Sequence, residues 1–145
     1  MPILYLTPLA HTRKIMFTYQ LRVHIEDTDY MGLVYYANYL KYFERARSEW
    51  ADASGYGMDW QQEQQVYFPV RNVEIEYLKP ARLHELVDVT SRIIDIGKVT
   101  FTYEQDLRPA DQKGTLLCKA HTKVVCVDYN FKPKMIPDFL KNQLS

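Results

Sequence analysis

Residues 39–53 most constrain the fold, because they form the single long segment with helical periodicity in a chain otherwise patterned as strands. The apolar residues on one stripe of this segment are Tyr39, Phe43, Ala46, Trp50 and Ala53, with Tyr42 beside them. Asn38 precedes the segment as a plausible N-cap, and Gly55 follows it as a plausible C-terminal stop. We therefore predict one long amphipathic helix that buries this stripe against a sheet.

The segments around this helix alternate between apolar and polar residues, which is typical of half-buried strands. In residues 17–26 the apolar face consists of Phe17, Tyr19, Leu21, Val23 and Ile25. Four more strands are predicted within residues 73–77, 87–93, 99–105 and 116–126, followed by a short helix at 139–144. Short turns between successive strands favour antiparallel pairing. The predicted class is α+β, with one long helix wrapped by a curved antiparallel sheet of about five strands.

The length of 145 residues fits one domain, which we place at residues 17–145 after an N-terminal extension of residues 1–16. No apolar run approaches the roughly 20 residues that a membrane span needs. Cys118 and Cys126 lie eight residues apart within one predicted strand, too far apart for a disulfide. We therefore expect two reduced thiols in a cytoplasmic protein, with no metal site.

The charges sum to zero, from 18 basic and 18 acidic side chains, which argues against a dedicated nucleic-acid binder. Their distribution along the chain is uneven. Residues 17–60 hold 4 basic and 7 acidic side chains, whereas residues 92–145 hold 9 basic and 6 acidic ones. A polyanionic ligand would therefore find its cations in the C-terminal part of the chain.

Asp27 and Asp29 stand two residues apart between the first predicted strand and the long helix. An ordinary role in a turn or cap remains open for both, because Asp is common there. Gly32 permits close approach to Asp29, and Tyr30 and Met31 place apolar surface around its carboxylate, which would raise its basicity. The following helix presents free N–H groups nearby. A carboxylate facing free backbone donors suits attack on a carbonyl group with stabilisation of the oxyanion.

Several motifs in this region and beyond it resemble those of a known family. They are Glu26-Asp27-Thr28-Asp29 with Gly32, Val34-Tyr35-Tyr36-Ala37-Asn38-Tyr39 and Tyr42-Phe43-Glu44-Arg45-Ala46-Arg47, then residues 73–77, 80–82 and 124–128. Together they resemble the hotdog-fold acyl-CoA thioesterases, most closely the bacterial YbgC-type enzymes associated with the Tol–Pal system, relatives of 4-hydroxybenzoyl-CoA thioesterase. The resemblance spans about residues 17–143. It implies a hotdog fold, in agreement with the periodicity.

The resemblance also implies a reaction, the hydrolysis of a short-chain or aromatic acyl-CoA to the free acid and CoA without a metal or organic cofactor. Asp29 corresponds to the catalytic carboxylate, either as nucleophile or as general base on water, and both routes stay open. The backbone N–H of Tyr36 corresponds to the donor that polarises the thioester carbonyl, and Gly32 and Val34 are expected to contact substrate. Many YbgC-type sequences carry His in place of Tyr36, a departure that bears on the acyl group accepted.

The same resemblance implies homodimers or homotetramers, with each site formed between two subunits. Lys98, Lys132 and Lys134 are the candidates for contacts with the CoA phosphates, although ordinary solvated lysines remain the alternative. Acyl carrier protein is a possible partner. Two other functions stay open: a non-catalytic hotdog scaffold that binds acyl carrier protein or phospholipid-synthesis enzymes, and a hydratase or dehydratase. The absence of His between His24 and His84 counts against the latter.

Overall fold

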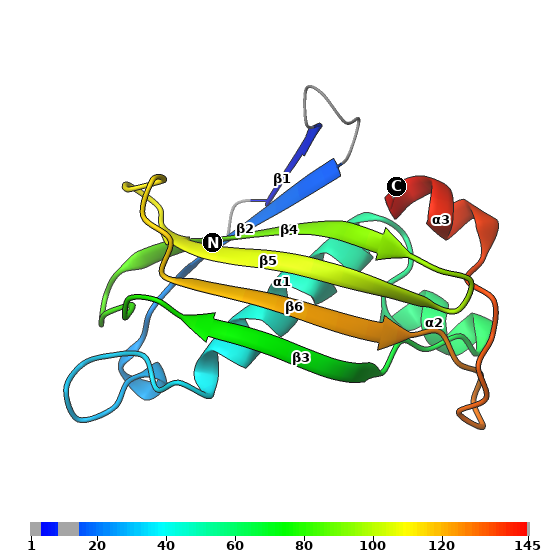
Figure 1. Ribbon diagram of the computed structural model, residues 1–145, viewed down its shortest axis with the longest axis horizontal. Helices are drawn as coiled ribbons and strands as arrows, with labels where there is room; N and C mark the ends of the chain where they lie inside the picture. Colours follow the sequence, from blue (N-terminus) through cyan, green and yellow to red (C-terminus); the bar gives the residue numbers. More distant parts are fainter. Residues whose placement is uncertain (1–3, 9–14, 145) are drawn as a thin grey trace.

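The computed structural model describes residues 4–8 and 15–144, which form one six-stranded sheet and three α-helices (Figure 1). The strands are β1 Leu4–Pro8, β2 Ile15–Arg22, β3 Val70–Tyr77, β4 Leu86–Ile96, β5 Thr100–Pro109 and β6 Cys118–Val125. The helices are α1 Asn38–Ala53, α2 Met58–Gln64 and α3 Asp138–Leu144, and a 3-10 turn, η1, covers Ile25–Asp27. All neighbouring strands pair antiparallel, in the order β1-β2-β4-β5-β6-β3. The predicted α+β architecture is confirmed.

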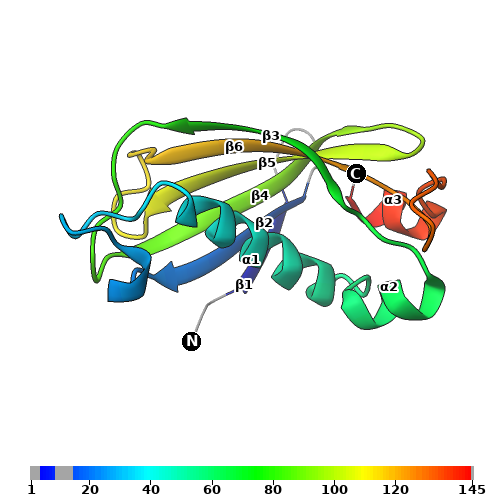
Figure 2. The ribbon, with the colours of Figure 1, turned by 90° about the horizontal axis from the view of Figure 1, so that it is seen from below.

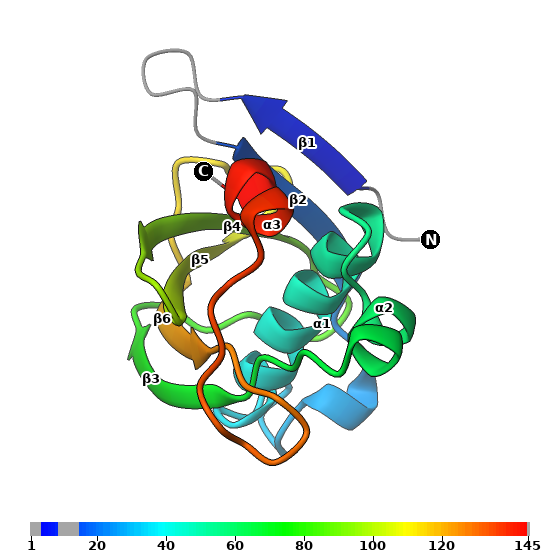
Figure 3. The same ribbon diagram turned by 90° about the vertical axis from the view of Figure 1, so that its right-hand side faces the viewer.

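The sheet has one strand more than the sequence pattern predicted. The additional strand, β1, comes from residues 1–16 and pairs with β2, with Leu6 opposite Phe17. It forms one edge of the sheet, and β3 forms the other (Figure 3). The domain boundary at residue 17 stays a prediction, but residues 4–8 and 15–16, which precede it, already take part in the sheet.

Helix α1 lies along one face of the sheet, which curves around it (Figures 2 and 3). It contains no β-branched residue, so its side chains keep their rotamer freedom in helical form. The predicted stripe is buried at Tyr39, Tyr42, Phe43, Ala46 and Trp50. Ala53 was expected on this stripe and is exposed, because the helix ends there, and Ala51 is buried instead. Gly55 follows in a left-handed conformation, with a φ of 83°, as expected of a helix stop.

A buried polar network fixes α1 to the sheet. The Gln105 side chain of β5 donates to the carbonyl oxygen of Phe43 in α1 at 3.0 Å and to the Ser91 hydroxyl of β4 at 2.9 Å. Arg47 of α1 in turn donates to the Gln105 amide oxygen at 2.9 Å. Both the oxygen and the nitrogen of this buried amide have hydrogen-bond partners. The network therefore sets the position of α1 over the strands at little cost in desolvation.

The first long strand ends earlier than its alternation predicted. Phe17, Tyr19, Leu21 and Val23 are buried as expected, whereas Ile25 is 75% exposed. The chain leaves the sheet at Arg22 and turns into η1, where the Asp27 carboxylate accepts the backbone N–H of His24 at 2.9 Å. This turn directs the chain from the sheet toward the start of α1. None of the helices in residues 15–144 is long and apolar enough to cross a membrane.

Candidate functional site

Asp29 lies in a tight turn between η1 and α1, partly exposed to solvent. Its Oδ1 atom accepts the backbone N–H groups of Met31 at 2.8 Å and Leu33 at 3.3 Å, and its own N–H donates to the Leu33 carbonyl at 2.8 Å. Gly32 has a φ of 73°, a left-handed conformation that the turn requires. The other carboxylate oxygen, Oδ2, accepts no hydrogen bond from any residue that the structure describes. Asp29 is therefore anchored through one oxygen and available through the other.

The start of α1 supplies the donors expected near Asp29. The backbone N–H of Tyr36 makes no hydrogen bond within the described part of the chain, so it is free to bind an oxygen atom. Asn38 was predicted as the N-cap, but the helix begins at Asn38 itself, and its side-chain amide donates to the Asp27 carbonyl at 2.9 Å. The Asn38 side chain thus joins the turn to the helix instead of capping the helix.

Asp29 and Tyr36 line the same hollow, of about 530 Å³, which we call the Asp29 hollow. Val34, 6% exposed, also lines it, whereas Gly32 shapes the turn beside it. The tyrosines in its wall are Tyr30, Tyr35, Tyr36, Tyr39 and Tyr77. The Tyr77 hydroxyl donates to the Tyr36 carbonyl at 3.0 Å, which ties the wall to the end of β3. The structure therefore brings together the predicted carboxylate, the predicted backbone donor and an aromatic wall.

One expectation about the surroundings of Asp29 is corrected, and one residue was missed. Tyr30 is 97% exposed and Met31 is 62% exposed, so within one chain neither buries the Asp29 carboxylate, although Tyr30 lines the same hollow. The sequence pattern also missed Lys79, which lines the Asp29 hollow directly after β3. Its position between Leu78 and Pro80 indicated only the end of a strand, and the strand pairing was needed to place it beside Asp29.

The β4–β5 turn, which contains Lys98, and the segment between β6 and α3, which contains Lys132 and Lys134, lie at the opposite end of the sheet from the turn between η1 and α1 (Figure 1). Backbone hydrogen bonds bring these two segments together. The N–H of Ile136 donates to the Lys98 carbonyl at 2.9 Å, and the backbone N–H of Lys134 donates to the Cys126 carbonyl at 2.8 Å. A hairpin with Val127 opposite Pro133 carries Lys132. Within one chain these three lysines do not meet Asp29, and their role stays a prediction.

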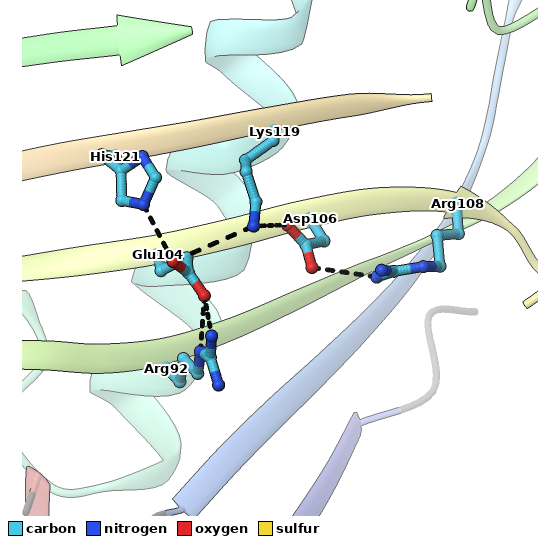
Figure 4. Close-up of polar contacts among 6 residues, drawn as sticks. All are labelled: Arg92, Glu104, Asp106, Arg108, Lys119 and His121. Atoms are coloured by element: carbon cyan, nitrogen blue, oxygen red, sulfur yellow. Dashed lines mark hydrogen bonds and ion pairs between the residues drawn. The ribbon is translucent and has the colours of Figure 1, made fainter. Parts of the chain in front are cut away.

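A second cluster of ionisable groups lies on the outer face of the sheet, away from α1 (Figure 4). Glu104 of β5 accepts hydrogen bonds from Arg92 of β4 and, at 2.8 Å, from His121 of β6. Asp106 pairs with Arg108 at 3.0 Å and with Lys119 at 3.6 Å. A larger hollow, of about 640 Å³, opens over this cluster, and we call it the outer hollow. Glu104 and Asp106 are paired with cations and Asp88 accepts a hydrogen bond from Gln20, so the size of this hollow does not make it a reactive site.

The cysteines and the metal-ligating residues provide no further chemistry. Cys118 and Cys126 are free and buried, and burial raises the pKa of Cys118 to about 12 and that of Cys126 to about 11. Both thiols are therefore protonated at neutral pH and unsuited to nucleophilic attack. Among the described residues, no three His, Cys, Asp or Glu side chains lie where they could hold a metal ion. The cytoplasmic location expected from these thiols stays a prediction.

Comparison with known proteins extends over nearly the whole described chain. The model of the thioesterase-like superfamily matches residues 23–144. The acyl-CoA thioesterase YbgC of Haemophilus influenzae is 36% identical over 127 residues, which are 86% of this chain and 91% of that protein. The acyl-CoA thioester hydrolase YbgC of Escherichia coli O6:H1 is 34% identical over 123 residues, covering 84% and 90%. A crystal structure of a probable thioesterase from Bartonella henselae is 30% identical, with a TM-score of 0.78, covering 84% and 99%.

Proposed function

Since the chain belongs to the thioesterase-like superfamily, we propose that it hydrolyses a short-chain or aromatic acyl-CoA with Asp29 as the catalytic carboxylate. The resemblance to hotdog-fold, YbgC-type thioesterases is confirmed by these relatives, and the chain is a thioester hydrolase. One observation carries the assignment of Asp29. Its Oδ1 atom accepts two backbone N–H groups, Oδ2 accepts no hydrogen bond from a described residue, and Asp29 lines the same hollow as Tyr36, whose N–H has no partner among the described residues.

Two routes start from the same oxygen atom. In the first, Oδ2 attacks the thioester carbonyl carbon, the C–S bond breaks, CoA leaves as a thiolate that takes up a proton, and water hydrolyses the mixed anhydride. In the second, Oδ2 removes a proton from the water molecule that attacks the same carbon, the C–S bond then breaks, and the CoA thiolate takes up that proton. In both, the Tyr36 N–H donates to the carbonyl oxygen as negative charge develops on it. The start of α1 adds its positive dipole end to that stabilisation.

The lining of the Asp29 hollow supports a short or aromatic acyl group. Five tyrosine rings provide flat apolar surface, and such rings stack against aromatic groups and pack against short aliphatic chains. Lys79 adds a positive charge at the same hollow. CoA carries several phosphate charges, so a cation near the mouth favours binding of this class of thioester.

A second copy of the chain would complete the site through β3, and we propose a homodimer that can assemble further into a homotetramer. β3 is an edge strand, and Val70 and Val73 are 45% and 37% exposed. An open edge strand presents unpaired backbone N–H and C=O groups and is prone to pair with another strand. Antiparallel pairing of two β3 strands would set the Tyr77 end of one copy beside the Val70 end of the other. The Lys132 hairpin adjoins the Val70 end, because Val127 pairs with Tyr67, so the second copy's lysines would approach the Asp29 hollow.

The test of Asp29 is a hydrolysis assay over short-chain, long-chain and aromatic acyl-CoAs and an acyl thioester of acyl carrier protein. We expect Asp29→Asn to lower the rate by about 10²-fold or more, the usual contribution of a positioned acid–base group. Asp111→Asn is the matched control, because Asp111 is an exposed carboxylate in the β5–β6 connection. An unchanged rate in Asp29→Asn would contradict the site. Absence of turnover in the wild type would favour the non-catalytic scaffold.

The test of the second copy is the change Val73→Asp, which places a charge on the open face of β3. Molar mass in solution, measured by light scattering, is expected to fall from that of an oligomer to that of a monomer. Because the lysines of the second copy would be lost, we also expect the KM for acyl-CoA to rise. A monomeric wild type with full activity would contradict the proposed dimer and leave the Asp29 assignment intact.

A further inference from the structure

Asp27 is the other carboxylate of the turn, and its environment differs from that of Asp29. It is 8% exposed and does not line the Asp29 hollow. Its backbone carbonyl accepts the N–H of Tyr35 and the side-chain amide of Asn38, both at 2.9 Å. Its Oδ2 atom accepts the N–H of His24 at 2.9 Å. Asp27 therefore joins the end of the first long strand to the residues on either side of Tyr36.

Tyr42 lies one helical turn after Asn38 on the same face of α1, and the Asn38 side chain is the one that binds the Asp27 carbonyl. The Tyr42 side chain is fully buried, and its hydroxyl makes no hydrogen bond of good geometry with any residue that the structure describes. Burial and the neighbouring Asp27 carboxylate raise the pKa of Tyr42 above its ordinary value. A buried hydroxyl without a partner is costly and rare, so a specific acceptor is expected for it. The Asp27 carboxylate is the acceptor that the surroundings offer.

We propose that Asp27 and Tyr42 form a positioning pair that holds the Asp29 carboxylate in place relative to the Tyr36 N–H. The pair spans the two parts of the site, because Asp27 precedes Asp29 by two residues and Tyr42 lies on the helix that follows Tyr36. This inference rests on the proposed function of Asp29 and Tyr36. It assigns Tyr42 and Asp27 no contact with substrate.

The pair matters because the two reacting groups lie on separate elements. Asp29 belongs to a turn held by its own backbone, and Tyr36 belongs to the approach to α1. A displacement of about 1 Å between catalytic groups can lower a rate by up to about 10²-fold. In this proposal, the buried contacts of Asp27 fix the separation between the Asp29 carboxylate and the Tyr36 N–H. Water cannot take the place of these contacts in the protein interior.

The test compares kcat and KM of four variants with those of the wild type. Tyr42→Phe and Asp27→Ala each break the pair, and we expect kcat to fall by about tenfold while KM changes by less than about twofold. Asp27→Asn keeps a side-chain oxygen that can accept from Tyr42 and from the His24 N–H, so kcat should stay within about threefold of the wild type. Tyr56→Phe is the matched control, because it removes an equally buried hydroxyl, bonded to Tyr103 at 3.3 Å, beyond the other end of α1.

A rate equal to that of the wild type in Tyr42→Phe would overturn the proposal. An Asp27→Asn variant as slow as Asp27→Ala would also overturn the proposal. That result would show that the negative charge of Asp27 is needed, which would make Asp27 a catalytic residue and not a positioning residue. An equal loss in Tyr56→Phe would mean that stability alone is measured, which also contradicts the pair.

Two further results separate this inference from the proposed function. If Asp27→Ala does not fold, Asn38→Ala weakens the contacts of Asp27 from their more exposed side, and kcat is expected to fall by about threefold; an unchanged kcat would count against the pair. If Asp29→Asn is as active as the wild type, the proposed function fails. If Asp29→Asn is inactive while Tyr42→Phe and Asp27→Ala are fully active, only the positioning pair fails.

Discussion

Asp29 and Glu104 are both partly buried carboxylates, but their partners differ. Glu104, whose side chain is 12% exposed, is bound by Arg92 and His121, with Lys119 at 3.9 Å (Figure 4). Among the described residues, the Asp29 side chain is bound only by backbone N–H groups, and only through one oxygen. Burial opposes ionisation of Glu104, but the hydrogen bonds from His121 and Arg92 outweigh it and hold the pKa of Glu104 below its ordinary value.

The difference shows why the outer hollow, although larger than the Asp29 hollow, is the less reactive of the two. A carboxylate surrounded by cations is held in place and its lone pairs are taken, so it contributes to stability. A carboxylate anchored by the backbone through one oxygen keeps a lone pair for a substrate. The partners of a carboxylate, more than the size of the cavity beside it, therefore indicate where chemistry occurs.

The largest expected effect is the fall in kcat when the backbone N–H of Tyr36, the free donor of the Asp29 hollow, is removed. Tyr36→Pro removes the backbone N–H, and we expect kcat to fall by about 10²-fold, as when one oxyanion donor is lost. Proline is tolerated at helix starts, and circular dichroism checks that the fold is kept. Tyr36→Phe keeps the N–H and is the matched control, with activity expected within about twofold. Similar activity in the two variants would mean that the backbone N–H of Tyr36 takes no part in the reaction.

The next effect concerns stability and belongs to the outer face. Glu104→Ala leaves Arg92 and His121 without their shared carboxylate, and we expect the free energy of unfolding to fall by about 1–2 kcal/mol. The loss stays below that of a fully buried pair, because Arg92 is 41% exposed and can be hydrated. Urea unfolding measures the change, and hydrolysis should remain as in the wild type. A fall in activity without a fall in stability would mean that Glu104 contributes to the reaction and not to the stability of the fold, which contradicts the contrast drawn with Asp29.

How far the sequence could predict each region follows from the range of the interactions. Helix α1 was predictable because its stripe of Tyr39, Phe43 and Trp50 is a local pattern. The tight turn at Asp29 was predictable because Gly32 lies three residues away. The strand predicted within residues 99–105 was also a local pattern, and its last residue, Gln105, is buried in β5.

Contacts between distant residues could not be derived in this way. The Glu104–His121 bond depends on the register between β5 and β6, which alternation within each strand does not give. Lys79 lines the Asp29 hollow, and Lys98 does not, because of how the strands are ordered in the sheet. The end of β2 was missed because Ile25 continues the alternation while the Asp27 carboxylate already turns the chain. Local patterns thus predicted elements, and the tertiary arrangement decided which charges meet.

A smaller effect is expected from pH, and its sign follows from the lowered pKa of Glu104. Because the folded pKa lies below the ordinary value of 4.5, the stabilisation by Glu104 is fully present above that value and is lost as the pH falls through the folded pKa. The difference in unfolding free energy between the wild type and Glu104→Gln should therefore shrink from about pH 7 to about pH 3.5. A difference that grows toward acid would mean that the cations do not hold the ionised form.

The smallest effect compares one lysine from each hollow. Lys79 lines the Asp29 hollow and Lys113 lines the outer hollow, and both are exposed. An exposed charge contributes about 0.2–1 kcal/mol to an ionic contact, so Lys79→Ala should raise the KM for acyl-CoA by about twofold to fourfold. Lys113→Ala should leave KM unchanged. Because salt screens exposed charges, the difference between the two variants should diminish as ionic strength rises from about 0.01 M to about 0.5 M. A larger rise in KM from Lys113→Ala than from Lys79→Ala would mean that the CoA phosphates bind at the outer face of the sheet, away from Asp29.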